Sequence, residues 1–281
     1  RWQSAIGRDL ALRLLPSAVA STVDSKLVKQ HVSQQDYGNN WLRTHSAGSG
    51  PYAISKYVPQ QALVLEQNPN AQPAPHLKRV LLKSVADAGS RRLLLEKGDA
   101  DVAYDLGADQ FATLKKQTNV RVASYPSALI YYLGFNTQDK QQPALGNPAL
   151  WQAARWLVDY NSLSTQLLKG QYQTHQTFLP AGFDGALDNQ PFHYDVAKAK
   201  AILAKGGIKP GTRFSLTIIN QPPYSDVAQA LQASFAKADI QIDIQPVAES
   251  ELWGKMRGRN FQSIFIYWGA DYVDANSNAS P

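Results

Sequence analysis

The sequence has 281 residues, with 28 lysines and arginines against 22 acidic residues, five histidines and no cysteine. Hydrophobic residues make up 44% and charged residues 18%, a balance that excludes wholesale disorder, and the length predicts about two domains. The absence of cysteine excludes disulfides, thiolate metal sites and a cysteine nucleophile. The net charge of +6 would suit a nucleic-acid partner, but basic residues adjoin only in pairs such as Arg91-Arg92, which is typical of a solvated surface and predicts no nucleic-acid binding. No apolar run approaches the roughly 18 residues of a membrane span.

Short helices and strands are expected in the first half of the chain. Asp87–Lys97 combines leucines with charged residues at helical spacing, and Gly98 is placed to end that helix. Leu129–Phe135 is β-rich and nearly all apolar, which predicts a strand buried on both faces. The other elements expected here are a helix over Ser25–Val32, strands over Tyr52–Val58, Ala62–Glu66, Val80–Val85 and Val102–Leu106, a helix over Asp109–Lys116 and a strand over Val120–Ser124.

The second half alternates helices and strands. A long helix is expected from Pro148 to about Leu168, with Asn147 as its N-cap and the proline in its first turn. The elements that follow are a helix over Asp195–Lys205, strands over Phe214–Asn220, Ile240–Gln245 and Ser263–Trp268, and helices over Ser225–Ala238 and Glu249–Arg257. This β-α-β-α-β order predicts an α/β sheet with helices packed on it. A change of composition across residues 136–147 predicts the crossing between two domains.

Most motifs of metal, nucleotide or nucleophile chemistry are missing. No two histidines have the i,i+3 or i,i+4 spacing of helical metal ligands, so neither a metal nor another cofactor is expected. Gly48-Ser49-Gly50 is followed by proline, which excludes a P-loop. Ser234-Phe-Ala-Lys237 matches the S-x-x-K pattern of some serine hydrolases without its companion motifs, and a hydrolase using Ser234 and Lys237 is kept as an alternative.

Two acids stand at a position typical of ligand sites. Asp271 and Asp274 follow the apolar strand Ile264–Trp268, and open α/β sheets bind ligands at the carboxyl ends of their strands. The alternative is that these acids cap a turn. Trp253 and Trp268 flank this region; large aromatics are usually core residues, but they also stack on ligands.

Eight segments, taken in order, resemble the family of extracytoplasmic solute-binding proteins (family 5) that serve peptide/nickel-type ABC importers. These segments are Gly48–Tyr52, Leu63–Asn70, Arg92–Ala103, Tyr132–Thr137, Asn147–Ala154, Phe178–Phe183, Tyr194–Lys200 and Trp268–Tyr272. Each segment alone is weakly specific, whereas their common order across nearly the whole chain is strongly specific.

The resemblance implies a two-lobed α/β fold of the type II periplasmic-binding-protein kind, with mixed sheets flanked by helices. It implies that residues 1–135 are part of lobe I, that residues 136–281 are most of lobe II, and that the sequence is an internal portion of the family pattern. The implied hinge strand is Tyr132–Asn136. The Val-Arg-Gln-Ala type run of relatives carries arginine where this chain has Trp151, so the role of that arginine is not transferred.

The implied function is the substrate-binding component of an ABC importer, without catalysis, that captures short peptides and delivers them to permease subunits. A monomer in the periplasm is expected, with a lipid anchor at the amino terminus left open. The alternative ligand is another small polar solute, such as an opine, a sugar or a metal chelate.

The resemblance also assigns ligand-binding residues. Asp271 matches the aspartate that pairs with the peptide α-ammonium in peptide-binding relatives, a charge-assisted contact suited to a partly buried carboxylate. Trp268 and Trp253 would form walls of side-chain pockets, and Gly269 and Tyr272 complete the expected site.

Overall fold

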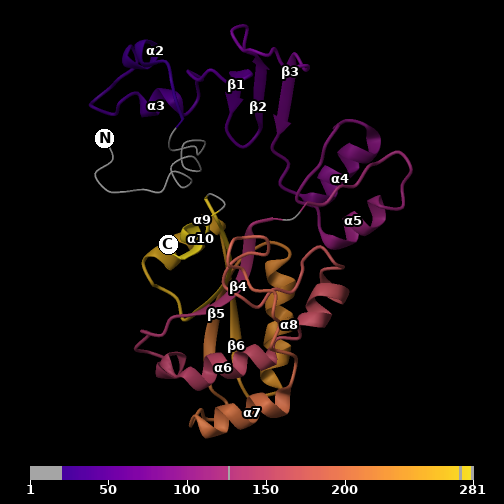
Figure 1. The fold of residues 1–281 in the computed structure, drawn as a ribbon, viewed down its shortest axis with the longest axis vertical. Coiled ribbons are helices and arrows are strands. Elements are labelled where there is room, and N and C mark those ends of the chain that lie inside the picture. The colour runs from indigo at the N-terminus through magenta and orange to yellow at the C-terminus, as the bar shows by residue number, and fades with distance from the viewer. Residues whose placement is uncertain (1–20, 126, 272–273, 280–281) are drawn as a thin grey trace. The chain divides into compact units, whose positions relative to one another are not determined.

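The computed structural model describes residues 21–125, 127–271 and 274–279, and its ribbon is drawn in Figure 1. The chain divides into two compact units, Arg1–Leu106 and Gly107–Pro281, which are treated separately below. The expected boundary between residues 135 and 136 refers to the lobes of the family fold and stays a prediction.

The first unit is built on a three-stranded antiparallel sheet in the order β1-β2-β3. Its strands are β1 (Tyr52–Val58), β2 (Ala62–Gln67) and β3 (Arg79–Lys83). β1 and β2 lie where the sequence predicts them, within one residue, whereas β3 begins one residue before and ends two residues before the predicted Val80–Val85. Two short helices, α2 (Ser25–Lys29) and α3 (Asn39–Leu42), precede this sheet.

Helix α4 (Ala88–Lys97) confirms the sequence prediction at both ends. The Asp87 carboxylate accepts from the backbone N–H of Ser90 at 2.7 Å and caps the amino terminus. Gly98 ends the helix in the left-handed region at φ 77°, where glycine carries no steric penalty.

The strand expected over Val102–Leu106 is wrong, because the backbone acceptors of this segment serve a side chain. The guanidinium of Arg91 donates to the carbonyl oxygens of Tyr104 and Asp105 at 3.2 and 2.6 Å. The same guanidinium also donates to the carbonyls of Val85 and Ala86, which precede α4 in the sequence. The planar fork of arginine thus fixes the segment as an irregular loop.

The second unit contains a mixed sheet in the order β4-β7-β5-β6. Its strands are β4 (Leu129–Phe135), β5 (Arg213–Ile219), β6 (Gln241–Val247) and β7 (Ser263–Gly269). β7, β5 and β6 are parallel, whereas β4 pairs antiparallel with β7 along its whole length. The strand expected over Val120–Ser124 is wrong, since this segment has no ladder partner among the described strands.

Helices alternate with most of the strands of this unit along the chain, as the β-α-β-α-β order predicts. They are α5 (Ala108–Leu114), α6 (Pro148–Leu157), α7 (Val196–Lys205), α8 (Tyr224–Ala236), α9 (Glu249–Arg257) and α10 (Ala275–Ala279). Figure 1 shows α8 alongside the strands, and it contacts both β5 and β6. Phe214 and Leu216 of β5 and Phe235 of α8 are fully buried in this core.

β4 is an edge strand, and the expectation that both its faces are buried is wrong. Leu129 is 42% exposed and Tyr132, on the opposite face, is 36% exposed, so neither face of β4 is covered along its whole length. Leu133 and Phe135 nevertheless pack against the core.

The long helix expected from Pro148 to about Leu168 is divided in two. α6 ends at Leu157, with Val158 extended, and a π-helical turn follows over Ser162–Leu167. The Leu157 carbonyl accepts from the Ser234 hydroxyl of α8, and the Asp159 carboxylate accepts from the backbone N–H of Ser162 at 3.0 Å. A tertiary hydrogen bond and a new cap therefore divide the helix.

α6 and α7 pack closely through Gly206, which follows α7. A Cβ atom at Gly206 would lie 2.0 Å from the Cβ of Ala149. The side chain of Asn147, which caps α6 as expected, also donates to the Gly206 carbonyl at 2.9 Å. Trp151, which stands where relatives carry arginine, donates its indole N–H to the Leu145 carbonyl at 2.8 Å and so has a structural partner.

Candidate functional site

The carboxyl ends of β5, β6 and β7 lie at one edge of the second sheet, because these three strands are parallel. β6 runs into Glu249 and α9, and β7 runs into Ala270 and Asp271. β4 begins at the same edge, since Leu129 pairs with Gly269. Open α/β sheets bind ligands at this edge.

Gly269, an expected site residue, faces the side chain of its ladder partner Leu129. A Cβ atom here would lie 2.5 Å from Cδ2 of Leu129, the residue that pairs with it across the ladder. A side chain at position 269 would therefore require the Leu129 side chain to move.

Asp271 is exposed, which corrects the expectation of a partly buried carboxylate. It stands past the end of the β7 ladder, where no neighbouring strand covers it. Its backbone N–H donates to the Ser277 hydroxyl at 2.9 Å. The Asp271 carboxylate has no hydrogen-bond or ion-pair partner in the parts of the chain that are described. Asp274 has the capping role that was the alternative to ligand binding. Its carboxylate accepts a hydrogen bond from the backbone N–H of Asn276 at 2.9 Å and caps α10.

Trp268 stands three residues before Asp271 and is half-buried. Its indole N–H lies 3.4 Å from the Ser277 carbonyl. Ser277 thus contacts both Trp268 and the Asp271 backbone and fixes the two residues relative to each other. Tyr272 lies outside the described residues.

Trp253 belongs to a second group at this edge, which sequence reasoning missed. Its ring meets that of Tyr267 edge to face, with centroids 5.7 Å apart. Both side chains donate to the same oxygen, Oε1 of Glu249, at 3.3 Å from Trp253 and 2.9 Å from the Tyr267 hydroxyl. The available signal was the place of Glu249, two residues past the end of β6.

A layer of phenolic rings lies behind Tyr267. Tyr131 lies 5.7 Å from Tyr267 and 5.9 Å from Tyr224, centroid to centroid. Burial first, and then the proximity of Tyr131, raises the pKa of Tyr224 far above its usual range. Burial, followed by the hydrogen bond to Glu249, also raises the pKa of Tyr267. Both hydroxyls are therefore neutral donors at physiological pH.

The comparison with protein families decides the class of this molecule. The model of the bacterial extracellular solute-binding proteins, family 5 Middle, matches residues 9–281. The chain belongs to this family. Membership confirms the resemblance read from the sequence and the extracytoplasmic class that it implied.

Three known proteins illustrate what the chain is similar to. It is 30% identical over 91% of its length to a probable D,D-dipeptide-binding periplasmic protein of Escherichia coli, covering 49% of that protein. A periplasmic binding protein from Helicobacter pylori, in complex with the peptide STSA, matches 95% of this chain and 52% of its own with TM-score 0.82 and 21% identity. A dipeptide-binding protein from a Pseudoalteromonas species was solved in complex with Met-Leu. The match covers 96% of this chain and 54% of that protein, with a TM-score of 0.82 and 18% sequence identity.

These relationships confirm the expected fold. Solved structures of the type II periplasmic-binding-protein kind superpose on nearly the whole chain. The chain spans about half the length of the curated relatives that it matches.

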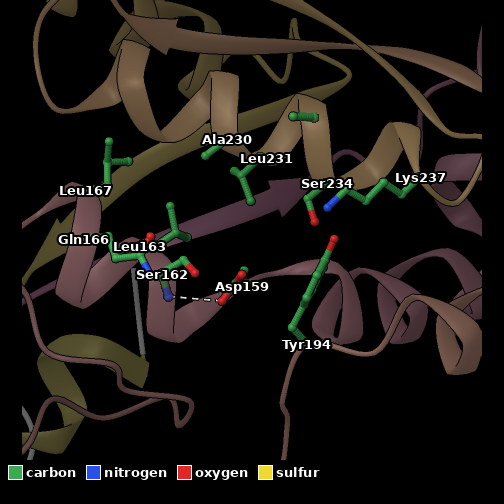
Figure 2. A pocket seen from close by; sticks show the side chains of 11 residues that line it. Asp159, Ser162, Leu163, Gln166, Leu167, Tyr194, Ala230, Leu231, Ser234 and Lys237 are labelled. Atoms are coloured by element: carbon green, nitrogen blue, oxygen red, sulfur yellow. Dashed lines mark hydrogen bonds between the residues drawn. The ribbon is translucent and has the colours of Figure 1, made fainter.

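The alternative serine-hydrolase site lies elsewhere in this solute-binding chain. Ser234 and Lys237 line a cavity of about 400 Å³ between α8 and the π-helical turn, as Figure 2 shows. The Ser234 hydroxyl is buried and donates to the Leu157 carbonyl, which cannot accept a catalytic proton. Lys237 Nζ lies 5.4 Å from the ring centroid of Tyr194. This arrangement holds α8 against α6 and does not activate a nucleophile.

Neither a metal site nor a membrane span is found in the described part of the chain. Within it, no cluster of three or more histidine, cysteine, aspartate or glutamate side chains could hold a metal ion. None of its helices combines the length and apolarity needed to cross a bilayer.

Proposed function

We propose that the chain is the ligand-binding part of the substrate-binding component of a peptide-importing ABC transporter. In this proposal the protein captures short peptides in the periplasm, delivers them to permease subunits, acts as a monomer and catalyses no reaction. Two kinds of relative support it: a protein named as dipeptide-binding and solved neighbours in complex with a tetrapeptide or with Met-Leu.

The observation that carries the proposal is the Asp271 carboxylate at the carboxyl end of β7. Its backbone is fixed by Ser277, while the carboxylate itself has no partner among the residues described. A carboxylate in this state is ready to accept a charge-assisted hydrogen bond from an ammonium group. Trp268, fixed by the same serine, supplies an apolar wall beside it.

Capture follows from these contacts. The α-ammonium of the peptide would pair with Asp271, while backbone hydrogen bonds would hold the peptide main chain without selecting its sequence. A ligand that contacts both lobes of the full protein favours the closed state by its differential affinity. Tyr132–Asn136 remains the candidate hinge strand in this proposal.

A binding experiment on the full-length protein tests the ammonium contact. Calorimetry would compare Met-Leu with N-acetyl-Met-Leu for the wild type, for Asp271→Asn and for the control Asp274→Asn. We expect acetylation or Asp271→Asn to weaken binding by about 10-fold or more, since hydrogen bonds to charged groups contribute about 1.5–3 kcal/mol. Asp274→Asn should bind as the wild type does, because Asp274 caps α10.

Equal affinity of the wild type for the free and acetylated peptides would refute the contact. Mass spectrometry of ligands that co-purify with the full-length protein tests the ligand class. Recovery of an opine, a sugar or a metal chelate in place of peptides would refute the peptide assignment.

A further inference from the structure

The Glu249 carboxylate has an uncommon pair of partners for an acid on a helix. One of its oxygens accepts hydrogen bonds from the Tyr267 hydroxyl at 2.9 Å and from the Trp253 indole at 3.3 Å. Both donors are neutral, so these contacts orient the carboxylate without cancelling its charge. Glu249 is itself exposed, which leaves the anion accessible from solvent.

The neighbouring acid on the same helix is in a different state. Glu251, also in the first turn of α9, lies 3.5 Å from the Lys255 ammonium. In contrast, across residues 21–125, 127–271 and 274–279, no lysine, arginine or histidine lies within 4.0 Å of the Glu249 carboxylate. Among the described residues, the Glu249 carboxylate therefore has aromatic hydrogen-bond donors as partners and no counter-ion.

An exposed carboxylate beside aromatic rings is the set of groups that recognises an organic cation. The carboxylate accepts charge-assisted hydrogen bonds, and the electron-rich faces of tryptophan and tyrosine attract ammonium and guanidinium groups. Trp253 and Tyr267 pack edge to face at 5.7 Å, and the almost fully buried Tyr224 lies in the layer behind them. The rings are thus held rigidly, which limits the entropy lost on binding.

The place of Glu249 in the sheet relates it to Asp271. Each acid stands two residues past the end of its strand, Val247 for β6 and Gly269 for β7. β5 lies between these two strands, so their ends are separated by two strand spacings, or about 10 Å. One extended residue covers about 3.5 Å of this separation, and the four-carbon stem of a lysine at the second position of a peptide reaches across the rest.

We propose that Glu249, Trp253 and Tyr267 form a subsite for a second cationic group of the ligand, and that the protein selects short peptides with lysine or arginine at the second position. This inference rests on the proposed function, because it takes the peptide α-ammonium to lie at Asp271.

Glu249→Gln isolates the charge in this proposal. The amide oxygen of glutamine still accepts from Trp253 and Tyr267, so the aromatic geometry is kept while the negative charge is lost. The matched control is Glu251→Gln, which removes an equal charge from the same turn of α9.

Calorimetry on the full-length protein would compare Ala-Lys with Ala-norleucine, which has the same stem without the ammonium. We expect the wild type and Glu251→Gln to bind Ala-Lys about 10-fold more tightly than Ala-norleucine. In Glu249→Gln this ratio should fall to about one, with the affinity for Ala-norleucine unchanged.

Three outcomes would overturn the subsite. A wild type that binds both peptides equally would do so, as would a Glu249→Gln variant that keeps the preference. An equal loss of affinity for both peptides in Glu249→Gln would show that Glu249 orients Trp253 and exerts no charge selection. Binding of both peptides with no preference refutes the subsite alone, whereas the absence of peptide binding altogether refutes the proposed function and the subsite with it.

Discussion

Asn136 ties the end of β4 to the loop that leads into β7. Its side-chain amide donates to the carbonyl of Arg259 at 3.1 Å and to the carbonyl of Phe261 at 2.9 Å. Its backbone N–H donates to the Gln262 carbonyl at 2.9 Å, so the pairing of the two strands continues one residue beyond the ladder. The carboxyl end of the candidate hinge strand is therefore fixed by one asparagine.

We expect Asn136→Ala to lower the free energy of unfolding of the second unit by about 1–2 kcal/mol, because two carbonyls lose their donors. Urea titration followed by circular dichroism would measure the change. Gln138→Ala, an exposed position nearby, should leave the transition in place. An Asn136→Ala protein with unchanged stability would show that water replaces both bonds without cost.

Alanine substitutions at two glycines, Gly206 and Gly254, should change the stability of the protein in opposite directions. Gly206→Ala should destabilise the protein by about 1–3 kcal/mol, because the new methyl group would lie 2.0 Å from the Cβ of Ala149. Gly254→Ala, in the middle of α9 with no atom within 4 Å of the new Cβ, should stabilise it by about 0.5–1 kcal/mol.

A double-mutant cycle separates the clash from other effects of Gly206→Ala. Adding Ala149→Gly removes the methyl group that is hit, so the double variant should lose less stability than the sum of the two single variants. Additive losses would contradict the close approach of α6 and α7.

The cap of α4 predicts a dependence of stability on pH. The Ser90 hydroxyl and then the Ser90 backbone N–H lower the pKa of Asp87 below its ordinary value of 3.8. The unfolded chain therefore binds this proton more readily than the folded one. The resulting stabilisation is complete above pH 3.8 and is lost as the pH falls through the lowered folded value.

Unfolding midpoints measured between pH 2 and pH 6 would check this. In Asp87→Asn the pH-dependent stabilisation from this cap should vanish, since the asparagine amide does not titrate in this range. In Ser90→Ala it should shrink, because the largest cause of the shift is removed. A midpoint for Asp87→Asn that follows the wild type across the whole range would contradict the cap.

Local signals made several elements predictable from the sequence. Asp87 and Gly98 mark the two ends of α4, and Asn147 with Pro148 marks the start of α6. The carboxyl end of β7 was predictable for the same reason, so Trp268 and Asp271 were placed at the edge of a sheet before the fold was known. Each of these assignments depends on residues within a few positions of one another.

Three of the failures share a different cause, which is a side chain from elsewhere in the chain. Ser234 accounts for the end of α6 at Leu157, 77 residues earlier in the sequence. Arg91 takes the carbonyls of the segment expected to be a strand. Glu249, on α9, was missed at the site because its partner Tyr267 stands on β7, 18 residues further along the chain. Tertiary hydrogen bonds of this kind have no signature in a single sequence.

The pairing of β4 with β7 has a consequence for the order of assembly. Leu129 pairs with Gly269, 140 residues further along the chain, so this ladder closes a very long loop. Contacts of such sequence separation form slowly, because the entropy of loop closure must be overcome before the pairing stabilises the chain. The edge that carries Gly269 and Asp271 is therefore completed only when strands from both ends of the second unit have met. Until this ladder has formed, the chain lacks the assembled edge that positions Gly269 and Asp271.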